Sequence, residues 1–494
     1  MSKQLIFLFD YFLSEGTLPN GLSPQCVAEI YNLHTTKYYT KELQNDYQGD
    51  FVPIHIKNEH FVKISSFFDF EYNDDFEISF KSVGDIFNRD PNVAFYSDKY
   101  VCVVETRGRW SRFFEMRTSN HLFNNISKHM LSLLQSGNTI LVINYMYEAL
   151  CENNAFDLLY KACIKYKVPL ENIIIISGDL NADGQYEHWY KNSSYKDKYP
   201  KINIWKSIHL LECASKSYLQ YSLHRNTEEN QFGYVSNDFT EKDAIELKDT
   251  IRKKYFLSMN NNVSSGAKQH RQIIGGFYIK ENLLDKGLVS FGELKTKDVP
   301  LRSYLINNEI EYKKLLPYIK QMAKKSPMQL DISDKDVWIS RHITANNLDC
   351  TDHYKNTYFS VVAESDYAGN PFLTAATVKC FGNLHPFVML STYKFLHELK
   401  KLGFKTFHPF IDESYDEIED NGERIFAIFN EIKRLCSKPK KELHDWYYSI
   451  LDSTLVHNKK VMLEYAKGNE RQDFFNRLYD FEIKQSSRLL NSNE

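Results

Sequence analysis

The sequence contains no apolar run of the ~18 residues that a membrane-spanning helix needs. Its first segment, QLIFLFDYFL, is apolar over only a few residues and is interrupted by Asp10, so it does not resemble a secretory signal. None of the eight cysteines forms a C-x-x-C pair, which speaks against a zinc ribbon or a redox dithiol. Widely scattered cysteines are typical of buried, reduced thiols. Together these absences predict a cytoplasmic protein.

Several nucleotide and metal motifs are also missing. No G-x-G-x-x-G follows a predicted strand, and there is no Walker loop or H-E-x-x-H. Asp179, Asn181 and Asp183 alternate as in a calcium loop, but the spaced Glu of such a loop is absent. Lys and Arg total 61 against 64 Asp and Glu, and the net charge of −3 argues against a general nucleic-acid coat.

What the sequence does contain is a regular alternation of strands and helices. Its 494 residues, at ~150 per domain, allow two large domains or three smaller ones. From Tyr100, short apolar strands alternate with helices of amphipathic spacing: YVCVVET, HLFNNISKHMLSLLQSG, TILVINYMY, AFDLLYKACIKYK, ENIIIISGD and KINIWKS. The earlier segments QLIFLFDYF and FEISF are also predicted strands. This order predicts a doubly wound parallel sheet.

A polar segment over 225–250 predicts a linker, after which the alternation resumes. KKYFLSMN, GLVSFG, NTYFSVVAES, HPFVMLS and FKTFHPF are the predicted strands of this second half, and the chain from 417 to 494 is predicted to be helical. The predicted domains are 1–240, 250–440 and a helical tail 441–494 that packs back on them. Two such sheets would face a central cleft, with ligands at the carboxyl ends of their strands.

Two segments of the second half carry groups suited to an anionic ligand. After FLSMNNN, which includes Asn260, a polar loop leads into a helix that begins with His270 and Arg271. The free N–H groups of a helix start attract anions, and Arg271 could grip a diphosphate. A solvated helix start is an equally good interpretation of this segment.

The second segment runs from Tyr358 to Asp416. Glu364 and Ser365 end a strand, Thr374 opens a helix, and Lys379 lies within that helix. A carboxylate at a strand end can hold ribose hydroxyls, while a helix start and a cation hold phosphate. A surface Glu and an N-cap Thr explain the same pattern.

The acidic run DESYD, residues 412–416, follows the last predicted strand. It is interpreted as a capping loop in which Ser414 and Asp416 lead into the next helix, with a metal site as the alternative.

The segment from Tyr358 to Asp416 resembles the donor-binding half of GT-B glycosyltransferases of the fucosyltransferase-like kind. It resembles more closely a set of uncharacterised viral and bacterial glycosyltransferases. The matching segments are VVAES, FLTAATVK, HPFVM, LKKLGFKTF and DESYD, with FLSMNNN, HR and GLVS upstream and INYMYEA and NIIIISGD in the first half. The similarity covers roughly residues 100–460. For a viral protein, the cytoplasm would be that of the host cell.

The resemblance implies a nucleotide-sugar donor, an acceptor that is a glycan, a nucleobase or a protein, and no metal or other cofactor. It implies that Arg271 binds the donor phosphate, that Glu364 lines the nucleotide pocket and that Thr374 lies beneath the diphosphate, whereas Lys379 binds the donor or only supports its helix. The full predicted donor-binding set is Asn260, His270, Arg271, Glu364, Ser365, Thr374, Ala375, Ala376 and Lys379.

A general base is expected in the first half. Glu148, in NYMYEA, falls at the carboxyl end of a predicted strand and is the first candidate for deprotonating the acceptor hydroxyl. Asp10 and Asp179 are its rivals.

One departure from the family pattern bears on activity. Ala375 and Ala376 stand where the pattern has Glu-Lys, two charges that would hold the ribose and neutralise the leaving diphosphate. Three explanations are open: the chain is inactive or uses Arg271 instead, the alignment differs at this turn, or the alanines were introduced by substitution. Alanine is also simply a good helix former. The sequence therefore predicts a glycosyltransferase, with an inactive nucleotide- or glycan-binding relative as the alternative.

Overall fold

A computed structural model describes residues 3–9, 76–82, 100–105, 114, 122–126, 128–146, 154–212, 214–215, 239–260, 263, 268–292, 294, 309–328, 351–468 and 473–481. The chain forms two compact units, one of residues 1–207 with 469–494 and the other of residues 208–468. The predicted linker over 225–250 lies outside the described residues as far as residue 238. Among the described residues, no helix has the length and apolar character needed to cross a membrane.

The first unit contains a six-stranded sheet in which all neighbouring strands are parallel. Every residue of Ile173–Ser177 is buried, as a strand covered on both faces requires. The strand order is β2 (Phe76–Ser82), β1 (Lys3–Phe9), β3 (Tyr100–Glu105), β4 (Thr139–Tyr145), β5 (Ile173–Ser177) and β6 (Asn203–Lys206).

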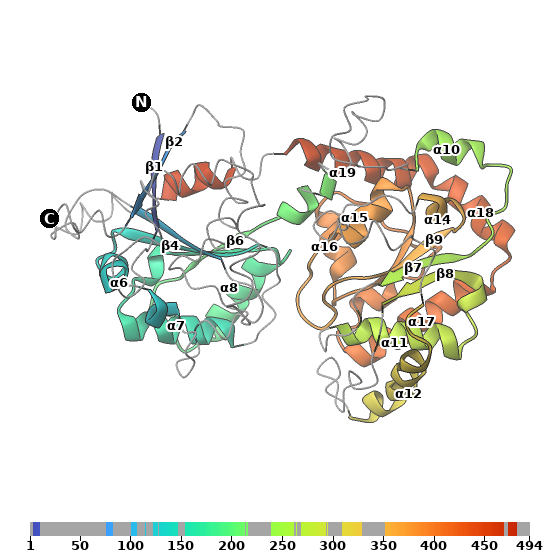
Figure 1. Cartoon of the computed structure of the whole chain (residues 1–494), viewed down its shortest axis with the longest axis horizontal. Helices are drawn as coiled ribbons and strands as arrows, with labels where there is room; N and C mark the ends of the chain where they lie inside the picture. The colour runs from blue at the N-terminus through green and yellow to red at the C-terminus, as the bar shows by residue number, and fades with distance from the viewer. Residues whose placement is uncertain are drawn as a thin grey trace, which may run out of the picture. The chain divides into compact units, whose positions relative to one another are not determined.

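Alternate residues of these strands form two apolar layers, one on each face of the sheet. One layer packs Ile143 and Ile175 against helices between residues 122 and 192; the other packs Val142 and Ile176 against the C-terminal helical segment 473–481. Figure 1 shows these helices on opposite sides of the strands. The helices of the first layer are α5 (Leu122–Asn125), α6 (Lys128–Gln135), α7 (Ala155–Tyr166) and α8 (Ala182–Asn192), with a 3₁₀ turn η3 (Leu170–Asn172).

The second unit has a four-stranded parallel sheet flanked by helices (Figure 1). Its strand order is β10 (Phe387–Leu390), β9 (Phe359–Ala363), β7 (Phe256–Asn260) and β8 (Gly287–Phe291). The surrounding elements are α10 (Glu241–Glu246), α11 (Gln269–Lys280), η5 (Leu284–Lys286), α12 (Glu309–Lys325), α14 (Thr351–Lys355), α15 (Ala375–Gly382), α16 (Phe395–Lys401), η7 (Ser414–Glu417), α17 (Asn421–Ser437), α18 (Lys440–Ser449), η8 (Leu451–Val456) and α19 (His457–Lys467).

Helices α11 and α12 approach each other closely at a glycine. A Cβ placed on Gly276 would lie 1.8 Å from the backbone oxygen of Tyr318, so any larger residue would force the helices apart. This contact packs α11, whose first turn carries His270 and Arg271, closely against α12.

The predicted strand at FKTFHPF, residues 404–410, is wrong. Phe404 and Phe407 are buried, but the segment forms no strand. Side chains, rather than a neighbouring strand, accept hydrogen bonds from two of its backbone N–H groups. The Lys405 N–H donates to Asn458 Oδ1 at 2.8 Å, and the Phe407 N–H donates to a Glu413 oxygen at 2.6 Å. Phenylalanine and threonine favour strands locally, and these long-range partners override that preference.

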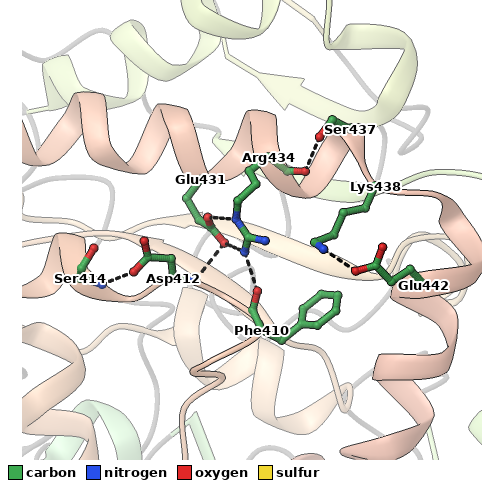
Figure 2. Close-up of polar contacts among 8 residues, drawn as sticks. All are labelled: Phe410, Asp412, Ser414, Glu431, Arg434, Ser437, Lys438 and Glu442. Atoms are coloured by element: carbon green, nitrogen blue, oxygen red, sulfur yellow. Dashed lines mark hydrogen bonds and ion pairs between the residues drawn. The ribbon is translucent and has the colours of Figure 1, made fainter.

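The end of this segment is attached to α17 by a polar cluster (Figure 2). Glu431 accepts hydrogen bonds from the Asp412 backbone N–H at 3.0 Å and from the Arg434 guanidinium at 2.6 Å. Arg434 also donates to the Phe410 carbonyl at 2.5 Å. One buried carboxylate and one guanidinium thus hold the end of the segment, in place of pairing with a strand.

The predicted fold class is confirmed: the chain is α/β, with two parallel sheets flanked by helices, and its C-terminal part is helical from α17 onward over the described residues. The strands predicted from the sequence, apart from residues 404–410, are the strands of the two sheets.

Candidate functional site

The predicted donor-binding residues gather at the carboxyl ends of β7 and β9 in the second unit. This edge of a parallel sheet is where open α/β folds bind ligands. Helix α11 begins beside β9, and helix α15 begins shortly after Glu364, which follows β9 directly. The side chains of Arg271, Glu364 and Thr374, predicted from separate segments, share contacts around Glu364.

The basic start of α11 contacts the backbone at the end of β9. Arg271 donates through Nη2 to the carbonyl oxygens of Ala363 at 3.0 Å and Glu364 at 3.2 Å. His270 Nε2 lies 2.8 Å from the same Glu364 oxygen, and Lys268 Nζ donates to the Ser365 carbonyl. Two cations and an imidazole therefore meet three consecutive carbonyl groups at the strand's carboxyl end.

The His270 ring is fully buried and neutral. A carbonyl oxygen can only accept, so Nε2 carries the proton. Burial, and then the neighbouring Arg271 charge, hold the pKa of His270 well below its ordinary value. The ring is stacked on Tyr367, with 5.5 Å between ring centroids and 14° between planes. His270 therefore supports the site as a neutral hydrogen-bond donor, while Arg271, whose pKa is lowered by burial, carries positive charge.

The Glu364 carboxylate lies at the start of α15 and is completely buried. It accepts from the backbone N–H groups of Ser365 and Thr374, each at 3.2 Å, and from the hydroxyls of Thr374 and Thr377. Thr374 is the N-cap of α15, and its hydroxyl accepts from the Ala376 N–H at 3.3 Å. A negative charge at a helix start is also stabilised by the helix dipole.

The remaining predicted donor-binding residues lie around these groups. Ser365, Ala375, Ala376 and Lys379 are half-buried, the two alanines forming the first turn of α15. Asn260 ends β7 and is buried, with its amide donating to Ser258 Oγ at 3.1 Å. The structure brings the nine residues to one edge of the second sheet; their contacts with a donor remain predictions.

Of the three predicted catalytic residues, only Asp179 lies among the described residues; Glu148 and Asp10 fall outside them. Asp179 follows β5 and is fully buried. Its Oδ1 accepts from the Asn181 N–H at 2.8 Å, and its carbonyl accepts from the Ala182 N–H at 3.3 Å. Asp179 thus shapes the turn that begins α8, and a role as base remains a prediction.

The acidic run 412–416 caps a different helix from the predicted one. Asp416 accepts from the backbone N–H groups of Leu396 at 3.0 Å and His397 at 3.1 Å, in the first turn of α16. Helix α17 is capped by Asp420 instead. Over the residues that the structure describes, no group of three or more Asp, Glu, His and Cys side chains is arranged to hold a metal ion.

Sequence reasoning missed three contributors to the site: Lys268, Thr377 and Arg424. Thr377 lies one helical turn after Thr374, and this spacing could have placed both hydroxyls on one face. Arg424 lies in α17, far along the chain, and donates to the carbonyl of Tyr367, the residue stacked on His270. Nothing in the local sequence marks that contact.

No family model matches the chain, and no curated protein sequence matches it. Solved structures match weakly. An E. coli trehalose-6-phosphate protein bound to UDP-2-fluoro glucose has a TM-score of 0.36 and 9% identity, covering 96% of this chain and 99% of its own. A Burkholderia multivorans trehalose 6-phosphate synthase has a TM-score of 0.36 and 9% identity, covering 82% and 74%.

A further match is the N-terminal domain of Candida albicans trehalose-6-phosphate phosphatase, with a TM-score of 0.32 and 10% identity, covering 78% of this chain and 76% of that one. Likenesses of this size support no conclusion about this chain.

Proposed function

We propose that the chain is a nucleotide-sugar-dependent glycosyltransferase of the GT-B kind. The donor would bind the second unit at the carboxyl ends of β7 and β9, and the acceptor, a glycan, a nucleobase or a protein, would be bound by the first unit. The observation that carries the proposal is the meeting of the Arg271-bearing start of α11 with the start of α15 at Glu364.

Charge and dipole favour an anion at this edge. The start of α11 contributes the positive end of a 12-residue helix dipole, and Arg271 and Lys268 add two cations. A guanidinium is the side chain best suited to phosphate oxygens because it presents paired donors in a plane. A diphosphate is therefore the ligand group that this edge is best suited to hold.

The proposed reaction is a displacement at the anomeric carbon. The acceptor hydroxyl loses its proton to a base, for which Glu148, Asp10 and Asp179 are the candidates. A bond forms between its oxygen and the anomeric carbon, while the bond from that carbon to the phosphate oxygen breaks. The electron pair leaves with the nucleoside diphosphate, whose developing charge the Arg271 side chain and the start of α11 stabilise.

The alternative is a catalytically inactive GT-B-like protein that binds a nucleotide or glycan. Ala375 and Ala376 favour it, because the resembling family has two charged residues there. Loss of one charged contact to a developing phosphate charge typically costs about 2.7–4 kcal/mol of transition-state stabilisation.

A thermal-shift screen against UDP, GDP, CMP and ADP sugars tests the proposal. A ligand at 100 times its Kd adds about 2.7 kcal/mol to stability, which is readily measured as a rise in Tm. Turnover is then measured as release of the nucleoside diphosphate. The same assays are run on the double variant Ala375→Glu/Ala376→Lys, with Ala375→Gln/Ala376→Met as a control of matched length without charge.

We expect a nucleotide sugar to raise the Tm of the unaltered chain. Release of nucleoside diphosphate by that chain supports the transferase, whereas release only after Glu-Lys is introduced, and not after Gln-Met, supports the inactive alternative. If no variant binds any nucleotide or nucleotide sugar, both proposals fail.

A further inference from the structure

Glu364 connects two helix starts through different parts of the same residue. Its backbone carbonyl oxygen accepts hydrogen bonds from His270 Nε2 at 2.8 Å and from Arg271 Nη2 at 3.2 Å. Both donors lie in the first turn of α11. Its carboxylate receives donors from Thr374 and Thr377, at the start of α15. A displacement of Glu364 would therefore move the two helix starts together.

The carboxylate is also saturated. Two carboxylate oxygens offer about four lone-pair sites. Four donors occupy them: the N–H groups of Ser365 and Thr374 and the hydroxyls of Thr374 and Thr377. Because the side chain is 0% exposed, a ribose hydroxyl could reach it only by displacing a threonine and opening the first turn of α15.

We propose that Glu364 is a positioning residue, with Thr377 as its partner, and that it does not contact the ribose of the donor. This inference rests on the proposed function, and it assigns Glu364 a different task from the ribose contact that a carboxylate at a strand end suggests. The carboxylate fixes the start of α15 and the connection 365–374, and its carbonyl orients Arg271.

In this arrangement, the attraction for an anion comes from α11 and not from α15. The Glu364 charge compensates the dipole of α15, and Glu364 and Thr374 satisfy amides of its first turn. The positive potential felt by a diphosphate therefore originates in α11 and its cations, and α15 supplies shape. Loss of the Glu364 carboxylate should therefore weaken the binding of pyrophosphate alone as much as the binding of a whole nucleotide.

Thr377 provides the cleanest test because it is 0% exposed and contacts the Glu364 carboxylate from inside the unit. Binding of UDP, of 2′,3′-dideoxy-UDP and of inorganic pyrophosphate is measured by calorimetry on the unaltered chain, on Thr377→Val, on Thr377→Ser and on Glu364→Gln. GDP or another diphosphate replaces UDP if the screen selects it.

We expect Thr377→Val and Glu364→Gln to weaken all three ligands by the same factor, about tenfold for one lost bond to a charged group. Thr377→Ser retains the hydroxyl and should restore binding to within about twofold. If Glu364→Gln weakens UDP but leaves dideoxy-UDP and pyrophosphate unchanged, the carboxylate contacts ribose directly and the inference is overturned.

A second threonine–glutamate pair in the same unit serves as the matched control. Thr406 donates to Glu413 at 2.7 Å, and neither residue is among the candidate site residues. Thr406→Val should lower Tm comparably without changing any of the three affinities. Hydrogen exchange at the Thr374 and Ala376 amides provides the structural readout and should accelerate in Thr377→Val but not in Thr406→Val.

The two proposals fail in different ways. If the unaltered chain binds no nucleoside diphosphate and no pyrophosphate, the proposed function falls, and this inference falls with it. If the unaltered chain binds them and Thr377→Val binds them equally well, the positioning role alone is overturned. Unchanged exchange at Thr374 and Ala376 in Thr377→Val would contradict it as well.

Discussion

The Arg424 guanidinium lies 4.7 Å from the centroid of the Tyr367 ring and donates to the Tyr367 carbonyl at 2.8 Å. The same group donates to the carbonyls of Ser391 at 3.2 Å and Ile418 at 2.8 Å. Arg424 is only 1% exposed. It thereby joins the end of β10, the connection between β9 and α15, and the start of α17, and it supports the ring on which His270 is stacked.

Replacing Arg424 with methionine should destabilise the second unit by about 3 kcal/mol or more. Methionine fills much of the volume but leaves several buried carbonyl groups without donors, each at a cost of about 1–3 kcal/mol. Equilibrium unfolding in urea gives the free energy. We also expect weaker binding of any diphosphate ligand, because Tyr367 and His270 lose their support.

Lys433→Met is the matched control on the same helix. Lys433 is 51% exposed and pairs with Glu281 at 2.7 Å. Exposed pairs of this kind contribute at most about 1 kcal/mol. Equal losses in the two variants would contradict the role assigned to Arg424.

The sequence is sufficient to predict the elements whose packing is local or periodic. The four consecutive isoleucines that open the segment 173–177 predict a buried parallel strand, and this segment is β5. The helix start at Thr374 is predictable because a threonine N-cap satisfies a free N–H within its own turn. Glu364 and Arg271 could be brought to one sheet edge because both adjoin strand ends.

Features that depend on distant partners could not be predicted. Residues 404–410 are predicted as a strand because phenylalanine and threonine favour strands, but the side chain of Asn458, 53 residues from Lys405, hydrogen-bonds to the backbone of Lys405 instead. Similarly, nothing near Glu364 in the sequence shows that its carboxylate is saturated, since Thr377 reaches it only after α15 folds against β9. The saturation follows from the tertiary arrangement.

Glu431→Ala should destabilise the second unit by about 2–3 kcal/mol. Glu431 is buried and accepts from Arg434 and from the Asp412 backbone, so its removal leaves a part-buried N–H without its acceptor and Arg434 bonded only to the Phe410 carbonyl within this cluster. Urea unfolding measures the loss. Glu442 is 45% exposed and pairs with the nearby Lys438 (Figure 2), and Glu442→Ala should change stability by no more than about 0.5 kcal/mol. Similar effects of the two changes would refute this account of the cluster.

Leu478→Ala should destabilise the first unit by about 2–5 kcal/mol, the usual cost of this change in a core. Leu478 is 0% exposed and belongs to the layer that packs Phe475 and Trp205 on the sheet. Pulse proteolysis in urea reports which unit opens. Asp480→Ala, on the exposed face of the same segment, should have almost no effect. Retention of stability in Leu478→Ala would show that the C-terminal segment does not complete this core.

Asp416 should make stability fall as the pH rises from about 4 to about 6. Burial, assisted by Glu417 and Glu413, raises the pKa of Asp416 from 3.8 to about 6 despite the hydrogen bonds from Leu396 and His397 that lower it. The native state therefore binds this proton more tightly than the unfolded chain does. The stabilisation is complete below about pH 3.8 and is lost as the pH passes through about 6, at most about 3 kcal/mol.

Urea unfolding of the unaltered chain and of Asp416→Asn at pH 4, 5, 6 and 7 measures this effect. The asparagine does not titrate. The free energy of unfolding of the variant, relative to that of the unaltered chain, should therefore rise steadily up to about pH 6 and no further. Asp412→Asn provides a control of opposite sign, because hydrogen bonds from Ser414 lower the pKa of Asp412 and its stabilisation is lost as the pH falls. A stability difference between Asp416→Asn and the unaltered chain that does not vary with pH would mean that Asp416 stays ionised at the start of α16.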